Sequence, residues 1–238
     1  MKINLFLSFT FAAIVAACST GCSSSSESPQ PIPSNHHLTT GDSFTYHQYQ
    51  TDLDSVKIDG SDTTITATVV GTNLSIEGRT DVTEIHGTDT VDIAVENDSL
   101  FRILQHRVDV SADASIPAIW VPFDARVVSR TILDSSQAAV VNGADATVTT
   151  KVEVNYLGKG SVTVNSKAVA TIRFAKVITV VVSFPAFGDF TTIVTISYSY
   201  APEIGYVATK SERSYSDTQF SPVPNGITES VLTSYTLK

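Results

Sequence analysis

The feature of this chain that most restricts its fold is an alternation of side-chain character with a period of two residues. It recurs from about residue 41 to the C-terminus, for example at Val148, Val152 and Val154 and from Phe190 to Tyr200. Successive side chains of a strand point to opposite faces of a sheet, so this alternation is typical of strands with one buried face. No window of helical length shows an apolar stripe of period 3.6. The pattern therefore predicts an all-β domain.

Short turn sequences separate the predicted strands, among them Asp59-Gly60, Asn142-Gly143 and Asn225-Gly226. Parallel neighbours need crossovers of a dozen or more residues, so short links predict antiparallel pairing. We expect a largely antiparallel curved sheet, and the pattern leaves open whether it forms a half-barrel, a barrel or a sandwich. One short helix is predicted between about 132 and 141.

The run from Val177 to Phe187 departs from the alternation, because only Thr179, Ser183 and Pro185 interrupt its apolar residues. Both faces of such a strand favour burial. We therefore expect this run to be either the central strand of the sheet or the floor of an apolar cavity.

The single tryptophan, Trp120, follows a loop that contains Pro117. An indole ring buries a large area. This favours a position in which Trp120 closes the end of the β-core over one in which it lines a ligand pocket.

The N-terminus has the features of a secretory signal peptide. Met1-Lys2 supplies one positive charge, and a mainly apolar run from Ile3 to Ala17 follows it. A membrane-spanning helix needs roughly 20 predominantly apolar residues, so this run fits a cleaved signal better than a span. The residues Val15-Ala16-Ala17-Cys18 resemble the lipobox of bacterial lipoproteins, in which an aliphatic residue and two small residues precede the lipidated cysteine.

The lipobox resemblance implies cleavage before Cys18 and attachment of diacylglycerol and a further acyl chain, such as palmitate, to that cysteine. Cys22 is the alternative anchor, but Ser19 stands where the lipobox has an aliphatic residue. The chain has no other cysteine, so the domain depends on its core rather than on disulfides. Three acyl chains exceed the two signals that stable membrane anchoring requires.

These features divide the chain into a signal peptide (1–17), a tether lipidated at Cys18 (18–40) and a single antiparallel β domain (41–238). The tether is rich in serine and proline and poor in apolar residues, so it cannot form a core. As a coil of about 20 residues it spans roughly 25 Å. Ser19 follows the anchor, at a position where aspartate commonly retains lipoproteins at the inner membrane. We therefore expect a cell-envelope protein at the outer membrane, on its periplasmic or surface face.

The charge balance restricts the partners of the domain. The chain has 15 basic and 24 acidic residues, and removal of the signal peptide with Lys2 leaves 14 basic residues and a net charge of −10. Nucleic acids and anionic lipid headgroups repel such a surface. We therefore expect no nucleic-acid partner.

The histidines do not have the spacing of a metal site. Zinc ligands recognisable in a sequence usually occur in pairs two to five residues apart. The adjacent pair lies in the tether, and the other three lie on separate predicted strands, so the sequence indicates no metal and no cofactor. The five residues are His36, His37, His47, His86 and His106.

An acidic segment contains Asp52, Asp54, Asp59 and Asp62. Oxygen ligands beside a glycine would suit calcium, but the spacing differs from a calcium loop and no glutamate completes a loop of twelve residues. A solvated hairpin loop explains the segment better.

The sequence contains no recognisable catalytic residues. A Gly-x-Ser-x-Gly motif and a glycine-rich phosphate loop are absent, and both cysteines belong to the anchor and tether. Carboxylates are abundant, but a sequence cannot show two of them facing each other across a substrate. A hydrolase with an unrecognised site is therefore the third hypothesis for the function.

Two segments resemble parts of uncharacterised secreted β-domain families. Ser197 to Val207 has an aromatic strand end, then Ala201-Pro202, then Gly205, and Gly41 to Tyr46 places a glycine before an aromatic first strand. Proline fixes φ and glycine accepts positive φ, which fits a tight connection. The resemblance implies a curved antiparallel sheet, similar to the half-barrels of periplasmic lipoprotein carriers. The resemblance implies no activity and identifies no site residues.

Together these observations predict a lipid-anchored, non-enzymatic envelope lipoprotein whose curved sheet holds an apolar small molecule or an envelope protein partner. The apolar run at 177–187 motivates the ligand. The second hypothesis is a structural or surface interaction module without ligand, which would expose an apolar patch or an unprotected edge strand.

Overall fold

The computed structural model describes residues 38–52, 56–96, 100–109, 114–202, 204, 208–215 and 226–238. Within these ranges the chain forms strands and turns without a helix, so the prediction of an all-β domain is confirmed. No helix in the described part of the chain has the length and apolar character to cross a membrane.

Twelve strands form one antiparallel sheet, and two short strands pair separately. In chain order the strands are β1 (Ser43–Thr51), β2 (Thr63–Ile76), β3 (Arg79–His86), β4 (Thr90–Glu96), β5 (Leu100–Gln105), β6 (Val108–Asp109), β7 (Ser115–Ile116), β8 (Ile119–Asp124), β9 (Ser129–Val141), β10 (Ala144–Val164), β11 (Lys167–Phe184), β12 (Gly188–Tyr200), β13 (Ala208–Tyr215) and β14 (Gly226–Thr236).

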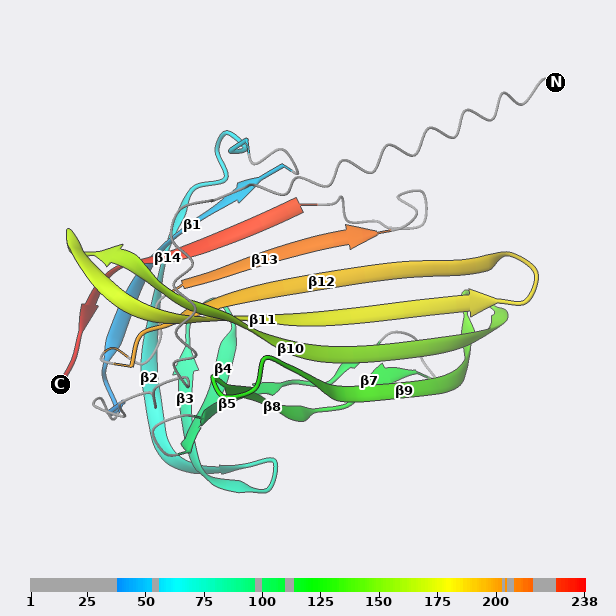
Figure 1. The fold of residues 1–238 in the computed structure, drawn as a ribbon, viewed down its shortest axis with the longest axis horizontal. Helices are drawn as coiled ribbons and strands as arrows, with labels where there is room; N and C mark the ends of the chain where they lie inside the picture. Colours follow the sequence, from blue (N-terminus) through cyan, green and yellow to red (C-terminus); the bar gives the residue numbers. More distant parts are fainter. Residues whose placement is uncertain are drawn as a thin grey trace, which may run out of the picture.

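The large sheet consists of two meanders that meet where the first strand pairs with the last. Its order is β8-β5-β4-β3-β2-β1-β14-β13-β12-β11-β10-β9. The β1–β14 pairing runs from Ser43 opposite Thr236 to Thr51 opposite Ile227, with a register shift after Thr45. Figure 1 shows β1 to β5 on one side of the molecule and the long strands β9 to β13 extending away from them.

The two edges of this sheet are neighbours in the sequence. β8 and β9 lie at opposite edges, yet only residues 125–128 separate them. Twelve flat strands would place these edges about 50 Å apart, because neighbouring strands lie ≈ 4.8 Å apart. The link spans at most about 17 Å. The sheet therefore has to curl, and it forms a curled half-barrel, one of the three shapes that the sequence left open.

A group of aromatic side chains fills the space between the two halves of the curled sheet. The ring of Phe101 on β5 stacks 4.8 Å from Phe123 on β8 and 4.5 Å from Tyr200 on β12. Phe123 meets the edges of Phe174 and Tyr198 at 5.5 and 5.0 Å. The core thus joins strands from the two halves of the sheet, and this packing holds the curl in place.

The segment 132–141 is a strand, so the prediction of a helix there is wrong. It belongs to β9, which pairs with β10 from Val141 opposite Ala144 to Ser129 opposite Asn155. From Leu133 onward its residues alternate between covered and exposed positions. The alanines and glutamine of this stretch do not determine its structure, because pairing with the long strand β10 overrides their helix propensity.

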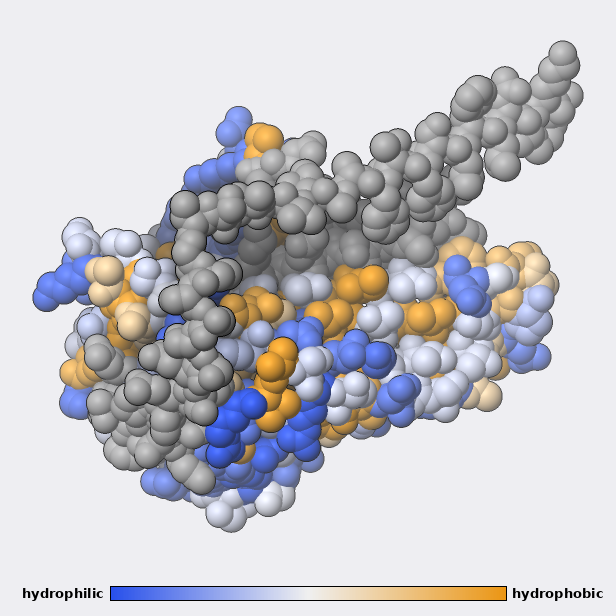
Figure 2. All heavy atoms as spheres, in the orientation of Figure 1, coloured by the Kyte–Doolittle hydropathy of each residue, from blue (hydrophilic) through white to orange (hydrophobic). Residues whose placement is uncertain are grey.

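The apolar run 177–187 lies in β11 and the turn after it, and β11 pairs with β10 and β12. β11 is the third strand from the β9 edge, and most of the run is half-buried or exposed, so the run is not the buried central strand that was expected. Ile178 is buried and packs with Ile116 and Val152. At the far end Phe187 is 74% exposed. Figure 2 shows apolar residues at the end of the molecule where Figure 1 places this turn. The run does not line the pocket described below.

Trp120 does not close the end of the core, so this prediction is also wrong. Its neighbours Val121 and Phe123 are buried in the core, whereas Trp120 is half-buried on the face of β8 that points away. The indole nitrogen donates a hydrogen bond to the Glu77 carbonyl at 3.1 Å. The Arg79 guanidinium lies 5.8 Å from the ring centre. The tryptophan therefore holds the β2–β3 turn against the outside of the sheet.

Lys176 on β11 is a cation in the interior, with only 4% of its surface exposed. Its ammonium group donates a hydrogen bond to Gln105 Oε1 at 2.7 Å, and no described carboxylate lies within ion-pair distance of it. Burial lowers the pKa of Lys176 to about 8 from 10.5. An unpaired buried charge costs free energy unless it is neutralised.

Replacement of Phe123 by alanine is expected to lower the free energy of unfolding by about 3–5 kcal/mol, because the side chain is fully buried among other aromatic rings. Phe187→Ala is the matched control, and we expect it to change stability by less than about 0.5 kcal/mol because that ring is exposed. Urea unfolding followed by circular dichroism measures both. Equal losses for the two variants would contradict the described core.

Lys176→Met is expected to stabilise the protein at pH 7. The folded-state pKa of about 8 lies below the unfolded value of 10.5, so the folded chain binds fewer protons between these values and its stability rises with pH there. Below pH 8 the charge costs about 3 kcal/mol. The advantage of the variant should shrink as the pH rises from 8 to 10.5, as measured by urea unfolding. A constant difference would argue against a buried charge.

Candidate ligand-binding site

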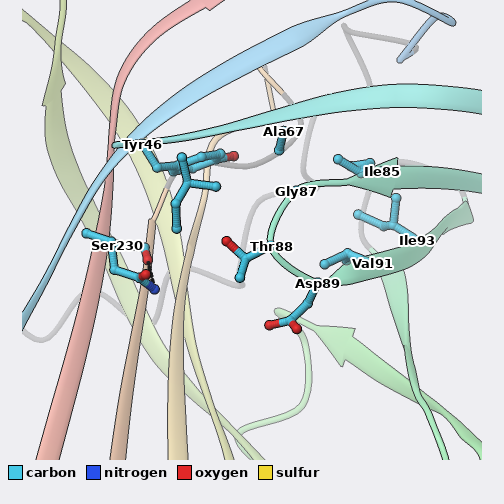
Figure 3. Close-up of a pocket in the computed structure, with 11 residues that line it drawn as sticks. Tyr46, Ala67, Ile85, Gly87, Thr88, Asp89, Val91, Ile93 and Ser230 are labelled. Atoms are coloured by element: carbon cyan, nitrogen blue, oxygen red, sulfur yellow. Dashed lines mark hydrogen bonds between the residues drawn. The ribbon is translucent and has the colours of Figure 1, made fainter. Parts of the chain in front are cut away.

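The described part of the structure contains an apolar cleft of about 180 Å³. It lies on the core side of β1 to β4, beside β14 (Figure 3). Alternation along the strands directs every second side chain to this side of the sheet. The walls are mainly apolar and consist of Tyr46, Ile65, Ala67, Ile85, Val91 and Ile93.

The cleft exists because small residues stand where neighbouring parts of the sheet have aromatic rings. Ala67 on β2 is buried and offers a single methyl group. A side-chain carbon added to Gly87 would lie only 3.2 Å from the Ala67 methyl carbon. Gly87 therefore allows the β3–β4 turn to pass close to β2, and a larger residue there would have to displace the wall.

Polar groups stand along the rim of the cleft. Gly87, Thr88 and Asp89 form the β3–β4 turn, which the Gly87 amide closes by donating to the Asp89 carbonyl at 3.1 Å. On the opposite side the Gln48 amide nitrogen donates to Ser230 Oγ at 3.1 Å. Figure 3 shows Thr88 and Asp89 across the opening from Ser230. The site thus combines an apolar interior with a few hydrogen-bonding groups, as ligand pockets generally do.

Two histidines and two carboxylates lie outside this cleft, on the outer side of β3 and β4. His106 Nε2 is 3.3 Å from Asp92 Oδ2, and His86 Nε2 is 2.5 Å from Glu84 Oε1. Asp92 is almost completely buried, and its second oxygen has no hydrogen-bond partner. Burial raises the pKa of Asp92, against the opposing effect of His106.

The third described histidine belongs to a different place. His47 Nε2 lies 2.6 Å from Asp62, which also pairs with Lys57 at 2.5 Å. The hydrogen bond from Lys57 lowers the pKa of the Asp62 carboxyl. His47 is therefore paired at the β1–β2 loop, whereas His86 and His106 lie at β3 to β5.

The acidic segment is an exposed loop that closes with ordinary turn hydrogen bonds. The Asp52 carboxylate accepts from the Val56 amide at 2.8 Å, and Asp59 is exposed. Among the described residues, no three His, Cys, Asp or Glu side chains are placed to hold a metal ion. Asp54 lies outside the described residues, as do Cys18, Cys22, His36 and His37.

Sequence reasoning did not identify the cleft. It singled out the run 177–187 for an apolar cavity, whereas the cleft lies in the other half of the sheet. Alternation does indicate that Ile85, Val91 and Ile93 share one face of the sheet. The two-residue period alone does not reveal whether other side chains pack against that face. Thr88 and Asp89 are typical turn residues, and they give no separate signal of a site.

Comparison with known proteins gives this chain no relative: no family model, no curated protein and no solved structure matches it.

Proposed function

We propose that this chain is a lipid-anchored envelope protein whose domain binds a small, mainly apolar ligand without chemical conversion. The observation that carries the binding function is the cleft on β1 to β4, with its volume of about 180 Å³ and its mainly apolar walls. Such a cleft lets a ligand bury apolar surface, and that burial is favourable by roughly 25 cal/mol per Å². The rim groups would orient the ligand.

The lining supports binding rather than catalysis. In the part of the chain that the structure describes, the lining contains one carboxylate, at Asp89, together with hydroxyl and amide groups, and it contains neither histidine, lysine nor cysteine. General acid–base or nucleophilic catalysis usually needs a nucleophile with a base within hydrogen-bond distance. The two carboxylate–histidine pairs at β3 and β4 lie on the other side of the sheet from the lining side chains Val91 and Ile93.

The proposal of an anchor rests on the sequence Val15-Ala16-Ala17-Cys18 and on the Ser/Pro-rich residues that follow it. Acyl chains on Cys18 would hold the domain at the membrane. Ser19 favours the outer membrane. The tether of about 20 residues then allows the domain roughly 25 Å of movement.

One observation favours a second function, that of a surface interaction module. The turn between β11 and β12 exposes Phe187, and the rings of Phe184 and Phe187 lie 6.3 Å apart. The Phe187 amide donates to the Phe184 carbonyl at 3.2 Å, which closes the turn. Exposed aromatic residues are enriched in protein interfaces.

Cys18→Ala is expected to abolish metabolic labelling of the protein with a palmitate analogue, because the proposed acylation site is lost. Cys22→Ala is the matched control and should keep full labelling. The measurement is in-gel detection of the label after expression of each full-length variant in a bacterial host. Full labelling of the Cys18 variant would contradict the proposed anchor.

A ring-sized hydrocarbon is expected to bind in the cleft of the mature chain (residues 18–238). The probe is benzene, and amide NMR shifts should appear at Ile85, Val91 and Ile93. A cavity of about 150 Å³ holds one benzene molecule. The larger side chain of Val91→Phe would occupy much of the cleft, so this variant should bind benzene at least about tenfold more weakly. Val140→Phe, at an exposed position of β9, is the control.

Both variants should keep the wild-type melting temperature within a few degrees, which separates a filled cleft from a misfolded domain. If benzene fails to shift the amides of the lining residues in the wild-type chain, the binding function is contradicted. The interaction module would then be the better hypothesis.

A further inference from the structure

The charges around the cleft indicate which chemical class of ligand it accepts. We propose that the cleft selects a compact hydrocarbon group that carries a positive charge, such as a primary ammonium. This inference rests on the proposed binding function and names the ligand class of the same site. It follows from the size of the cleft, from the hydrogen-bonding character of its rim and from an unpaired carboxylate.

The volume limits the apolar part of the ligand. A cavity of about 150 Å³ lined by aliphatic and aromatic side chains holds one benzene molecule. The cleft of about 180 Å³ therefore accepts one ring or a branched aliphatic group of similar size. An extended acyl chain is too long for it, so a small molecule fits this site better than a lipid does.

Among the described residues, Asp89 is the only charged one that lines the cleft. Its carboxylate has no ion-pair partner in the part of the chain that the structure describes. Some other carboxylates of the domain have basic partners, for example Asp124 with Arg126 at 2.9 Å and Glu153 with Lys151 at 2.9 Å, so what distinguishes Asp89 is its position beside the cleft. Asp89 therefore leaves a negative charge at the mouth of an apolar space, where a bound cation would be its partner.

The remaining rim groups offer acceptors to the same ligand. Gln48 uses its amide nitrogen for the bond to Ser230, so its carbonyl oxygen is left as an acceptor on the cleft side of β1. Thr88 is exposed beside Asp89 and adds a hydroxyl oxygen. An ammonium group has three donors and no acceptor, so it matches this set. A carboxylate ligand would face repulsion from Asp89.

Two further features favour a cation. The Tyr46 ring forms one wall (Figure 3), and the face of an aromatic ring attracts positive charge. The whole chain has a net charge of −9, which raises the local concentration of small cations near the surface. No lysine or arginine of the described ranges lines the cleft to oppose this effect.

The test compares three probes with the same ring: benzylamine, benzyl alcohol and benzoate. Each is titrated into the mature chain with Cys18→Ala, in detergent-free buffer at pH 7 and low salt, and amide NMR shifts give the dissociation constants. We expect benzylamine to bind about three- to fivefold more tightly than benzyl alcohol, the range typical of an exposed ion pair. Benzoate should bind most weakly. The preference for the amine should disappear in 1 M salt.

Asp89→Asn should reduce the ratio of amine to alcohol affinity to about one, because the charge is lost while a hydrogen-bonding group of similar shape remains. Asp145→Asn, an exposed position on β10, is the matched control and should keep the wild-type ratio. Melting curves of both variants check the fold.

The outcomes distinguish the proposed ligand class from the proposed binding function. Equal binding of amine and alcohol in the wild-type chain, or an unchanged ratio in Asp89→Asn, would overturn the inference about charge and leave the binding function standing. Failure of all three probes to shift the lining residues would overturn the binding function together with this inference. If Asp89→Asn removes the preference for the amine and Asp145→Asn keeps it, the result supports both the binding function and the proposed ligand class.

Discussion

The four-residue connection between β8 and β9 is the constraint on which the rest of the structure depends. It joins the two edges of a twelve-stranded sheet, and a flat sheet of that width cannot satisfy it. Curling brings β5 and β8 against β11 and β12, where Phe101, Phe123 and Phe174 pack. The Tyr156 amide donates to the Val128 carbonyl at 2.9 Å, which fixes the link beside β10. The curled shape, the aromatic core and the concave face that carries the cleft all follow from this connection.

The cleft and the aromatic core are two results of the same curl. Where the facing strands provide phenylalanine and tyrosine, the interior is filled, and those side chains are almost fully buried. Between β1 and β4 the same face carries Ala67 and Val91, and Gly87 brings the turn close to the sheet. Protein interiors are normally packed without large voids. A cleft is therefore retained here because the side chains are too short to fill it.

Much of the fold was predictable from local patterns, because strand alternation and turn residues act over a few positions. The alternation at 148–156 and at 190–200 predicted β10 and β12, and the short links predicted antiparallel pairing, which the structure confirms. The helix expected at 132–141 was wrong because the Asn142-Gly143 turn, with positive φ at both residues, folds this segment back onto β10 as a hairpin. Trp120 could not be placed, since its position depends on contact with Glu77, more than forty residues away in the sequence. The cleft was not predictable for the same reason: its walls come from β1, β2, β3, β4 and β14.

The arrangement of the sheet also relates the cleft to the proposed anchor. The described chain begins beside the C-terminus, where the Lys238 amide donates to Asp42 at 2.8 Å and the Gly41 amide donates to the Val69 carbonyl at 2.8 Å. The cleft lies on β1, which starts at this point, and on β2, which passes it at Val69. The turn with Phe187 lies at the other end of the long strands (Figure 1). If Cys18 is the anchor, as proposed, the chain enters the domain at Gly41, at the opposite end of the long strands from the β11–β12 turn.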